Sequence, residues 1–276
     1  MDLKTKIGAP RSVPIDRIVR ENARDVTIRL LTGDREPAPK PGQFFMVWVP
    51  DTDEIPLSIS RIGPGFIELT VRPVGDATNR LATMRHGDYV GLRGPLGNSF
   101  TLSDGRVIVV GGGIGMAPLR PLVHILCSCS QHVTVLVAAR TRDELLFVDE
   151  FSELKSSNEH LDLAVATDDG SSGFHGLATD LLKHILNRDR PDMIYTCGPE
   201  AMMYGVLQLA LTYNVALEAS LERYMKCGCG LCGSCALDNT GHLVCVDGPV
   251  FTQQELVLIE EFGKYTRDAT GMRTAL

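Results

Sequence analysis

Five of the eight cysteines of this 276-residue chain lie within the nineteen residues from Cys227 to Cys245. Any fold of this chain must bring these thiols together on a short, glycine-rich segment. Disulfide frameworks of such density are typical of secreted domains shorter than about 100 residues. This chain is longer, and its first ten residues, MDLKTKIGAP, lack the apolar core of a signal peptide. We therefore expect a cytoplasmic protein whose cysteines serve metal or redox chemistry.

The spacing of these cysteines indicates a [2Fe–2S] cluster. It reads C-x4-C-x2-C with a fourth cysteine ten residues later, which is the arrangement of plant-type ligands. The predicted ligands are Cys227, Cys232, Cys235 and Cys245. The small residues between them let backbone amides approach the sulfurs, and the fourth thiolate is expected on a separate strand, Leu243–Val246. A structural zinc site is the alternative, although it usually has two C-x2-C pairs and only one is clear here. Spacing alone does not exclude Cys229 as a replacement ligand.

Composition sets the size and the broad class of the protein. Hydrophobic residues make up 44% and charged residues 22%, which fits a soluble globular protein of two ordinary domains. The net charge of −7 argues against a nucleic-acid partner, because that affinity depends on clustered basic side chains. No apolar run of about 18 residues is present, so we expect no membrane span.

The pattern of apolar runs divides the chain into an all-β part and an α/β part. Short apolar runs separated by Pro and Gly predict a small barrel or sandwich from about residue 12 to 102. Apolar strands then alternate with helical stretches, which predicts a doubly wound parallel sheet. The expected strands are Val26–Leu31, Phe44–Val49, Ile67–Arg72, Tyr89–Arg93, Val107–Val110, Val133–Ala138, Leu161–Ala166 and Met193–Tyr195. The expected helices are Pro118–Cys127, Asp143–Leu154, Gly176–Leu186, Glu200–Tyr213 and Gln253–Phe262. Cys127 and Cys129 continue an apolar helical pattern and are expected to be at least partly buried.

A second chemical signal is a glycine-rich turn between a strand and a helix, VIVVGGGIGMAP. Such a turn lets backbone N–H groups and the helix N-terminus approach a pyrophosphate. It departs from the dinucleotide fingerprint at Pro118, and taken alone it also fits a tight turn without a ligand. The Cys-Gly-Pro sequence at the end of a later strand supports a ligand, because open α/β sheets bind ligands beyond those strand ends. The candidate nucleotide-binding residues are Gly111, Gly112, Gly113, Gly115, Cys197, Gly198 and Pro199.

Together with the segment GPLGNSF at 94–100, these motifs resemble the ferredoxin–NADP reductase-like flavoproteins, which pair an FAD-binding β-barrel with a pyridine-nucleotide domain. The segments SLERYMKCGCGLCGSC at 220–235 and VCVDGPVF at 244–251 narrow the match. They resemble the electron-transfer subunits of NAD-dependent, class B dihydroorotate dehydrogenase, over about residues 13–251. The resemblance implies an FAD-binding barrel at 12–103, an NAD-binding domain at 104–216, a [2Fe–2S] segment at 217–252 and a tail with one helix at 253–276.

The resemblance also assigns flavin contacts, with two departures from the family pattern. The motif R-P-(I/L)-S falls on IPLS, so that Ile55 replaces the Arg that would contact the FAD phosphates. The contact of a positive charge with the FAD phosphates is then weaker, or it comes from Arg61 or Arg80. The motif G-x-G-T falls on GDAT, with Ala77 in place of a glycine, and Ser58 is expected to hydrogen-bond the flavin ring. The implied FAD-binding residues are Pro56, Leu57, Ser58, Thr70, Val71, Arg72, Gly75, Ala77 and Thr78.

In the family that this chain resembles, electrons run from dihydroorotate through the FMN of a catalytic subunit to the cluster, to FAD and finally to NAD. A flavin is needed between the last two carriers because NADH exchanges two electrons and the cluster only one. The resemblance places Cys197 near the nicotinamide and implies a heterotetramer of two catalytic and two electron-transfer chains. This chain should hold no dihydroorotate site, and its partner should cover the face around the cluster, with Met225 and Leu231 as apolar contacts.

Other functions stay open from the residues alone. Related reductase subunits of sulfhydrogenases and of anaerobic sulfite reductase share the architecture. A non-catalytic iron–sulfur redox sensor is an alternative from another class, although the acidic composition offers no basic surface for nucleic acid. NAD is favoured by the family. Arg140 and Arg142 follow a predicted strand where they could meet the 2′-phosphate of NADP, but surface arginines are equally ordinary there.

Overall fold

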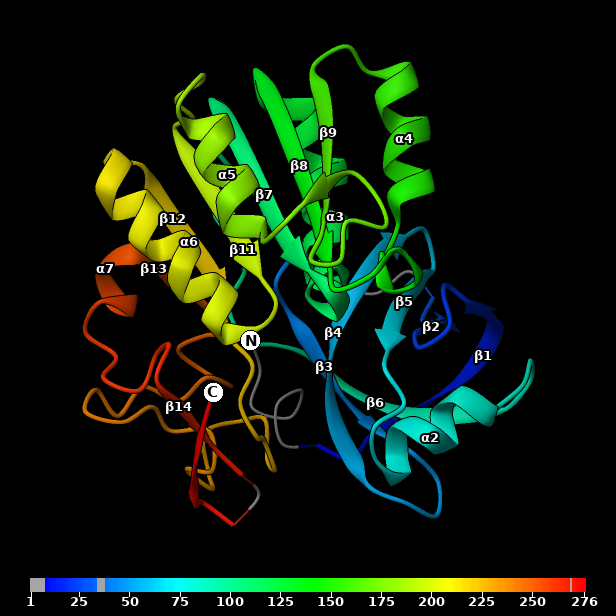
Figure 1. Cartoon of the computed structure of the whole chain (residues 1–276). Helices are drawn as coiled ribbons and strands as arrows, with labels where there is room; N and C mark the ends of the chain where they lie inside the picture. The colour runs from blue at the N-terminus through cyan, green and yellow to red at the C-terminus, as the bar shows by residue number, and fades with distance from the viewer. Residues whose placement is uncertain (1–7, 34–37, 269) are drawn as a thin grey trace.

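The computed structural model describes residues 8–33, 38–268 and 270–276, so the start of the chain, for which no signal peptide is predicted, lies mostly outside the described residues. The N-terminal part is a closed antiparallel barrel with the strand order β1-β2-β5-β4-β3-β6 (Figure 1). Its strands are β1 (Arg11–Arg20), β2 (Val26–Leu31), β3 (Phe44–Trp48), β4 (Glu54–Gly63), β5 (Phe66–Val71) and β6 (Tyr89–Leu96). Helix α2 (Asp76–Thr83) connects β5 to β6. The alternating apolar side chains of the strands fill the barrel.

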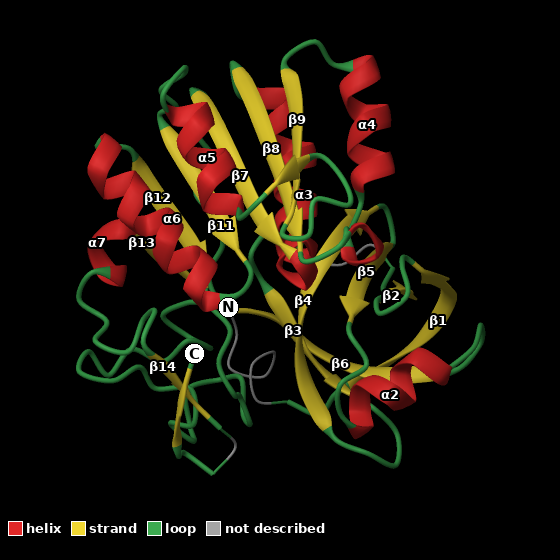
Figure 2. Cartoon of the chain, in the orientation of Figure 1, coloured by secondary structure: helices red, strands yellow, loops and turns green. Residues whose placement is uncertain are grey.

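The second part is a seven-stranded sheet with the order β10-β9-β8-β7-β11-β12-β13, parallel except for β13. Its strands are β7 (Arg106–Gly112), β8 (His132–Ala139), β9 (Leu161–Thr167), β10 (Phe174–His175), β11 (Met193–Cys197), β12 (Ala216–Ser220) and β13 (Val250–Thr252). Helices α3 (Met116–Cys129) and α4 (Val148–Ser157) cover one face, and α5 (Ala178–Leu186) and α6 (Glu200–Tyr213) cover the other (Figure 2). The predicted combination of a β-barrel and a doubly wound sheet is confirmed. No helix in the described part of the chain is long and apolar enough to cross a membrane.

The cysteine segment is a long loop between two neighbouring strands of this sheet, β12 and β13. The backbone N–H of Leu221 donates to the carbonyl of Pro249 at 2.8 Å and closes the neck of the loop. The loop, yellow to orange in Figure 1, lies below the sheet and beside the barrel. Strands β12 and β13 both pair in the large sheet. The boundary expected at residue 216, between the NAD-binding domain and the cluster segment, therefore falls at the start of a sheet strand.

Three expected elements differ from the structure. The helix expected at 143–154 is interrupted: the 3-10 turn η2 (Arg142–Glu144) precedes α4, and Phe147 between them has a φ of +60°. The helix expected at 253–262 ends after one turn, α7 (Gln253–Leu256), and is followed by turns and the hairpin of β14 (Tyr265–Arg267) and β15 (Arg273–Ala275). Cys245 lies in a turn and not on a strand, because Asp247 accepts the Leu243 amide at 2.6 Å and folds the segment back. Cys127 is partly buried as expected, whereas Cys129 is exposed.

A buried ion network joins the barrel to the sheet. Arg120, on α3, donates to Glu68 of β5 at 2.9 Å and to Glu150 of α4 at 2.5 Å. Glu68 is also bonded by Arg29 of β2 at 2.7 Å. Both Arg120 and Glu68 are almost fully buried, so each charge depends on the other for stabilisation. This network holds the two parts of the chain in one arrangement.

We predict that Arg120→Met costs about 3–5 kcal/mol of stability, the usual cost of removing one partner of a buried ion pair. Burial opposes ionisation of Glu150, but His124 and Arg120 outweigh it and lower its pKa from 4.5 to about 2. A lowered folded-state pKa stabilises the fold above about pH 4.5, and this contribution is lost between pH 4.5 and 2. Thermal unfolding as a function of pH should show this acid loss in the wild type and a smaller loss in the variant. Arg24→Met, which breaks the exposed link to Glu144, should cost less than about 1 kcal/mol; equal costs would refute the assigned role of Arg120.

Candidate functional site

The glycine turn and the Cys-Gly-Pro turn are in direct contact at the C-terminal edge of the sheet. Cys197 pairs with Gly111 where β11 and β7 end. A Cβ on Gly115 would overlap the backbone of Cys197 and Gly198, and a Cβ on Gly198 would lie 2.9 Å from the backbone of Gly112. The two turns that the sequence singled out therefore form one backbone-lined site next to the N-terminus of α3. Such a site can hold a pyrophosphate through its amides.

Arg72 connects this turn to the barrel. Its guanidinium donates to both oxygens of the fully buried Asp25, at 2.7 and 2.8 Å. It also lies 3.8 Å from the Cβ position of Gly113, whose φ of +52° only a glycine adopts easily. Arg72 is thus a cation held rigidly between the flavin segment and the glycine turn.

The other expected flavin residues divide between β4, β5 and α2. On β4, Pro56 and Ser58 are half-buried, while Leu57 packs with Ile55 against the barrel core. On β5, the hydroxyl of Thr70 bonds to Thr27 and Ser60 at 2.8 Å each, and Val71 is part of the core, so neither side chain is available. At the start of α2, Thr78 accepts the backbone N–H of Gly75 at 3.0 Å, and Ala77 is buried. Arg61 lies beside α3 and α4, and Arg80 is exposed on α2.

The four expected cluster ligands associate as two pairs. The side chains of Cys227 and Cys232 interact with each other, and so do those of Cys235 and Cys245. Cys229 also contacts Cys227. Among the described residues, no three His, Cys, Asp or Glu side chains converge as ligands of a single ion. A [2Fe–2S] cluster needs two thiolates on each of two irons, and two pairs on one loop are suited to that chemistry.

The loop also stabilises thiolates. The Cys227 sulfur accepts backbone N–H groups of Cys229, Leu231 and Cys232 at 3.3–3.5 Å. Burial opposes the thiolate, but these donors outweigh it and lower the pKa of Cys227 to about 6. The hydrogen bond between Cys235 and Cys245 lowers the pKa of Cys235 to about 7, and the same bond together with burial raises that of Cys245. One proton thus stays on the second pair, and binding of a metal would release it.

The structure adds two polar residues beside Cys197 that the sequence did not single out. Ser220, at the end of β12, lies beside the Cys197 thiol, and Glu222 follows it two residues later. Burial above all, with the charge of Glu222, raises the pKa of Cys197 to about 12. The thiol therefore keeps its proton at neutral pH. The adjacency of β11 and β12 in the sheet brings these residues together, and no local sequence pattern signals it.

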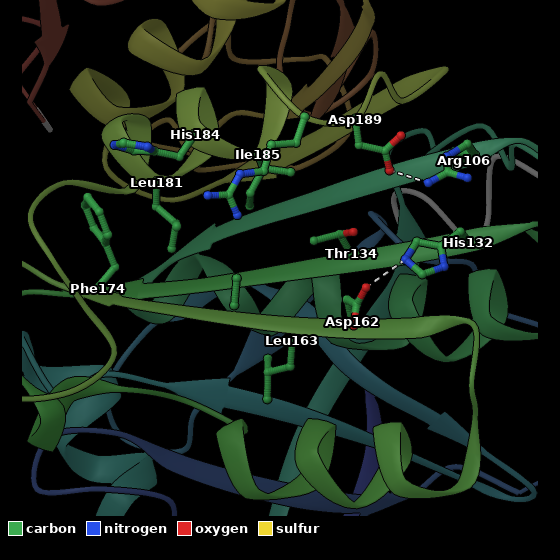
Figure 3. A pocket seen from close by; sticks show the side chains of 12 residues that line it. Arg106, His132, Thr134, Asp162, Leu163, Phe174, Leu181, His184, Ile185 and Asp189 are labelled. Atoms are coloured by element: carbon green, nitrogen blue, oxygen red, sulfur yellow. Dashed lines mark hydrogen bonds and ion pairs between the residues drawn. The ribbon is translucent and has the colours of Figure 1, made fainter.

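A separate groove of 610 Å³ lies between α5 and the sheet (Figure 3). Arg106 and His132 mark its position at the N-terminal ends of β7 and β8, the edge opposite the glycine turn. Four of its polar side chains form two ion pairs, Arg106 with Asp189 and His132 with Asp162 at 3.0 Å. None of the predicted cofactor residues lines it, so this groove is separate from the candidate site.

Comparisons with known proteins agree with this geometry. The family model described as the iron–sulfur cluster binding domain of dihydroorotate dehydrogenase B matches residues 222–257, and that of the oxidoreductase NAD-binding domain matches residues 109–208. The chain is 43% identical to the probable dihydroorotate dehydrogenase B (NAD+) electron transfer subunit of Methanothermobacter thermautotrophicus, over 97% of this chain and 98% of that one. The protein of the same description from Methanocaldococcus jannaschii is 40% identical, over 94% and 96%. The solved structure of an NADH-dependent reduced ferredoxin–NADP oxidoreductase, described in work on flavin-based electron bifurcation, is similar with a TM-score of 0.79 and 31% identity, over 90% of each chain.

The barrel, the nucleotide edge of the sheet and the cysteine loop together define a flavin-dependent, NAD-linked oxidoreductase of the ferredoxin–NADP reductase type with an added iron–sulfur segment. The chain belongs to the family of dihydroorotate dehydrogenase B (NAD+) electron transfer subunits. The family predicted from the sequence is confirmed, and so are its cofactors FAD, an iron–sulfur cluster and NAD.

Ile55 stands where the flavin motif R-P-(I/L)-S, taken from the sequence resemblance, has an Arg, and this leads to a prediction about flavin affinity. We expect Ile55→Arg to strengthen FAD binding by about 1–3 kcal/mol if the guanidinium reaches a phosphate, the range for hydrogen bonds to charged groups. The FAD dissociation constant, measured by fluorescence titration of the apoprotein, checks this. An unchanged constant would show that another group already binds the phosphates.

Proposed function

We propose that this chain is the electron carrier between NAD and a catalytic subunit that converts dihydroorotate to orotate in pyrimidine biosynthesis. The observation that supports it best is that three cofactor segments meet in one region. The glycine turn lies beside Arg72 of the flavin segment at Gly113, and the cysteine loop packs at Gly228 against Met46 of β3. Met46 in turn pairs with Pro56 of the flavin strand β4. When bound, FAD exchanges a hydride with the nicotinamide and single electrons with the cluster.

In this proposal the chain's own residues position the carriers. The backbone of Gly111, Gly112, Gly113 and Gly115 binds the nucleotide pyrophosphate, with Arg72 as the neighbouring cation. Cys197, with Gly198 and Pro199, lines the nicotinamide pocket and keeps its proton. Pro56, Leu57 and Ser58, the backbone of Thr70 and Val71 with the Arg72 side chain, and the α2 residues Gly75, Ala77 and Thr78 bind FAD. Cys227, Cys232, Cys235 and Cys245 bind the cluster. The barrel, nucleotide, cluster and tail regions are assigned to 12–103, 104–216, 217–252 and 253–276.

We propose that a partner covers the exposed edge of the cysteine loop. Leu231 is 77% exposed, and the neighbouring Cys232 and Gly233 are exposed as well. Met225 is only 8% exposed and packs inward, so Leu231 is the apolar contact that remains of the two expected. The proposed partner is an FMN-containing dihydroorotate dehydrogenase subunit, and two copies of each chain form the assembly. The proposed site of action is the cytoplasm, where cysteines stay reduced and able to bind a cluster.

The test uses the purified chain loaded with its cofactors. It should oxidise NADH with an artificial electron acceptor and form no orotate from dihydroorotate. A chain with bound zinc and no flavin would contradict the proposal. A chain that binds the cluster but cannot pass electrons from NADH would contradict it as well and favour a redox sensor. Turnover of dihydroorotate by the isolated chain would also contradict it.

A further inference from the structure

A buried arginine of the barrel touches the cysteine loop. Arg93, on β6, is 8% exposed, and its Nη1 donates to the backbone carbonyl of Cys227 at 2.9 Å. Its Nε and Nη2 donate to the two carboxylate oxygens of Glu54 at 3.1 and 2.7 Å. Glu54 therefore binds the Nε–Nη2 edge of the guanidinium, and the Nη1 group points to Cys227, the first of the expected cluster ligands. Among the positions assigned above to cofactors, none includes Arg93 or Glu54.

The contacts around Arg93 show that the cysteine loop packs against the barrel at this residue. Arg93 pairs with Met46 across β6 and β3. A Cβ on Gly228 would lie 2.6 Å from Met46 and 3.2 Å from Leu96, so the loop backbone is pressed against these side chains. Glu54 directly precedes the flavin motif on β4. The contacts of Arg93 with Glu54 and with Cys227 thus link the flavin strand to the cluster loop through polar groups.

We propose that Arg93 is a positioning residue that seats the Cys227 end of the cluster loop on the barrel and, through its charge, raises the reduction potential of the cluster. This inference rests on the proposed function, since it assumes a cluster on these cysteines. Reduction adds one electron to the cluster, supplied by the flavin or by the partner, and no protein bond forms or breaks. A buried cation that contacts the backbone of a cluster ligand favours the more negative, reduced state, because the effective dielectric constant of a protein is only about 20.

Arg93 keeps its positive charge in the folded protein. An arginine guanidinium does not lose its proton in proteins, and the Glu54 carboxylate at 2.7 Å is its ion-pair partner here. Glu54 offsets part of this charge from the far side, so removing the Glu54 charge should act on the cluster in the opposite direction from removing that of Arg93. This opposition separates an electrostatic role from a merely structural one.

The experiment measures the midpoint potential of the cluster by EPR-monitored titration in the full-length protein, with iron and sulfide contents determined for each variant. Arg93→Gln should make reduction about tenfold less favourable, which is 59 mV for a one-electron couple. Arg93→Lys should restore most of the potential, and Glu54→Gln should raise it above that of the wild type. Arg20→Gln, which removes an exposed arginine at the end of β1, is the matched control and should leave it unchanged.

The outcomes separate the inference from the function on which it rests. An Arg93→Gln protein with a full cluster and an unchanged potential would overturn the inference. If that variant fails to fold or to bind iron, Glu54→Gln decides: a potential that does not rise overturns the proposal. A wild-type protein without a [2Fe–2S] signal would instead overturn the proposed function.

Discussion

The Cys232→Ser variant is expected to lose the visible absorption of the iron–sulfur cluster and the delivery of electrons to a catalytic partner. Cluster binding needs all four thiolates, and Cys232 is paired with Cys227 in the loop. The flavin segments lie on the barrel, so transfer from NADH to a dye through FAD should partly survive. Iron and sulfide analysis, together with the two activity assays, measures both effects.

Cys229→Ser is the matched control for this prediction. Cys229 lies in the same loop and contacts Cys227, but it falls outside the two ligand pairs. The cluster should therefore stay in place in this variant. Unchanged iron and sulfide in Cys232→Ser, or loss of the cluster in Cys229→Ser, would show that the ligand assignment is wrong.

Gly115→Ala is expected to abolish the reduction of the flavin by NADH. The added methyl group would overlap the backbone of Cys197 and Gly198, which cannot move aside as a flexible side chain can. We expect a loss of stability of about 1–3 kcal/mol, as for other overpacked sites, and separation of the two turns that form the nucleotide site. Stopped-flow reduction by NADH and the thermal midpoint measure the two effects.

Chemical reduction provides the control for Gly115→Ala. Dithionite should still reduce the flavin and the cluster of this variant, because it does not use the nucleotide site. Gly75→Ala is a steric control for stability, since a methyl group there meets nothing within 4 Å. Normal reduction by NADH in Gly115→Ala would show that the contact between the two turns is not needed for nucleotide binding.

Much of the fold could be predicted because its signals are local. The strand Val26–Leu31 and the helix Glu200–Tyr213 have the limits that the periodicity predicts. The helix expected at 253–262 was wrong although Leu256, Ile259 and Phe262 are all buried at helical spacing. Turns after Leu256 bury these side chains equally well, and they let Glu261 bond Arg223 at 2.7 Å. The spacing of apolar residues indicates which side chains are buried. In this segment it did not predict the backbone conformation.

The site was predictable only where a motif lies on one short segment. The cysteine spacing and the two glycine turns are such motifs. Arg93, Glu54 and Ser220 act through contacts between segments far apart in the chain, and no local pattern marks them. Arg120 did carry a local signal, as a single charge within the buried stretch Met116–Val123, but its acidic partners come from β5 and α4.

The most direct test of the account is reconstitution with a catalytic partner. The cofactor-loaded chain is mixed with an FMN-containing dihydroorotate dehydrogenase subunit from the same source, and orotate formation is followed together with the reduction of NAD. We expect NAD-linked orotate formation by the mixture and none by this chain alone. Failure of this pair, combined with electron transfer to a hydrogenase or sulfite reductase subunit, would contradict it.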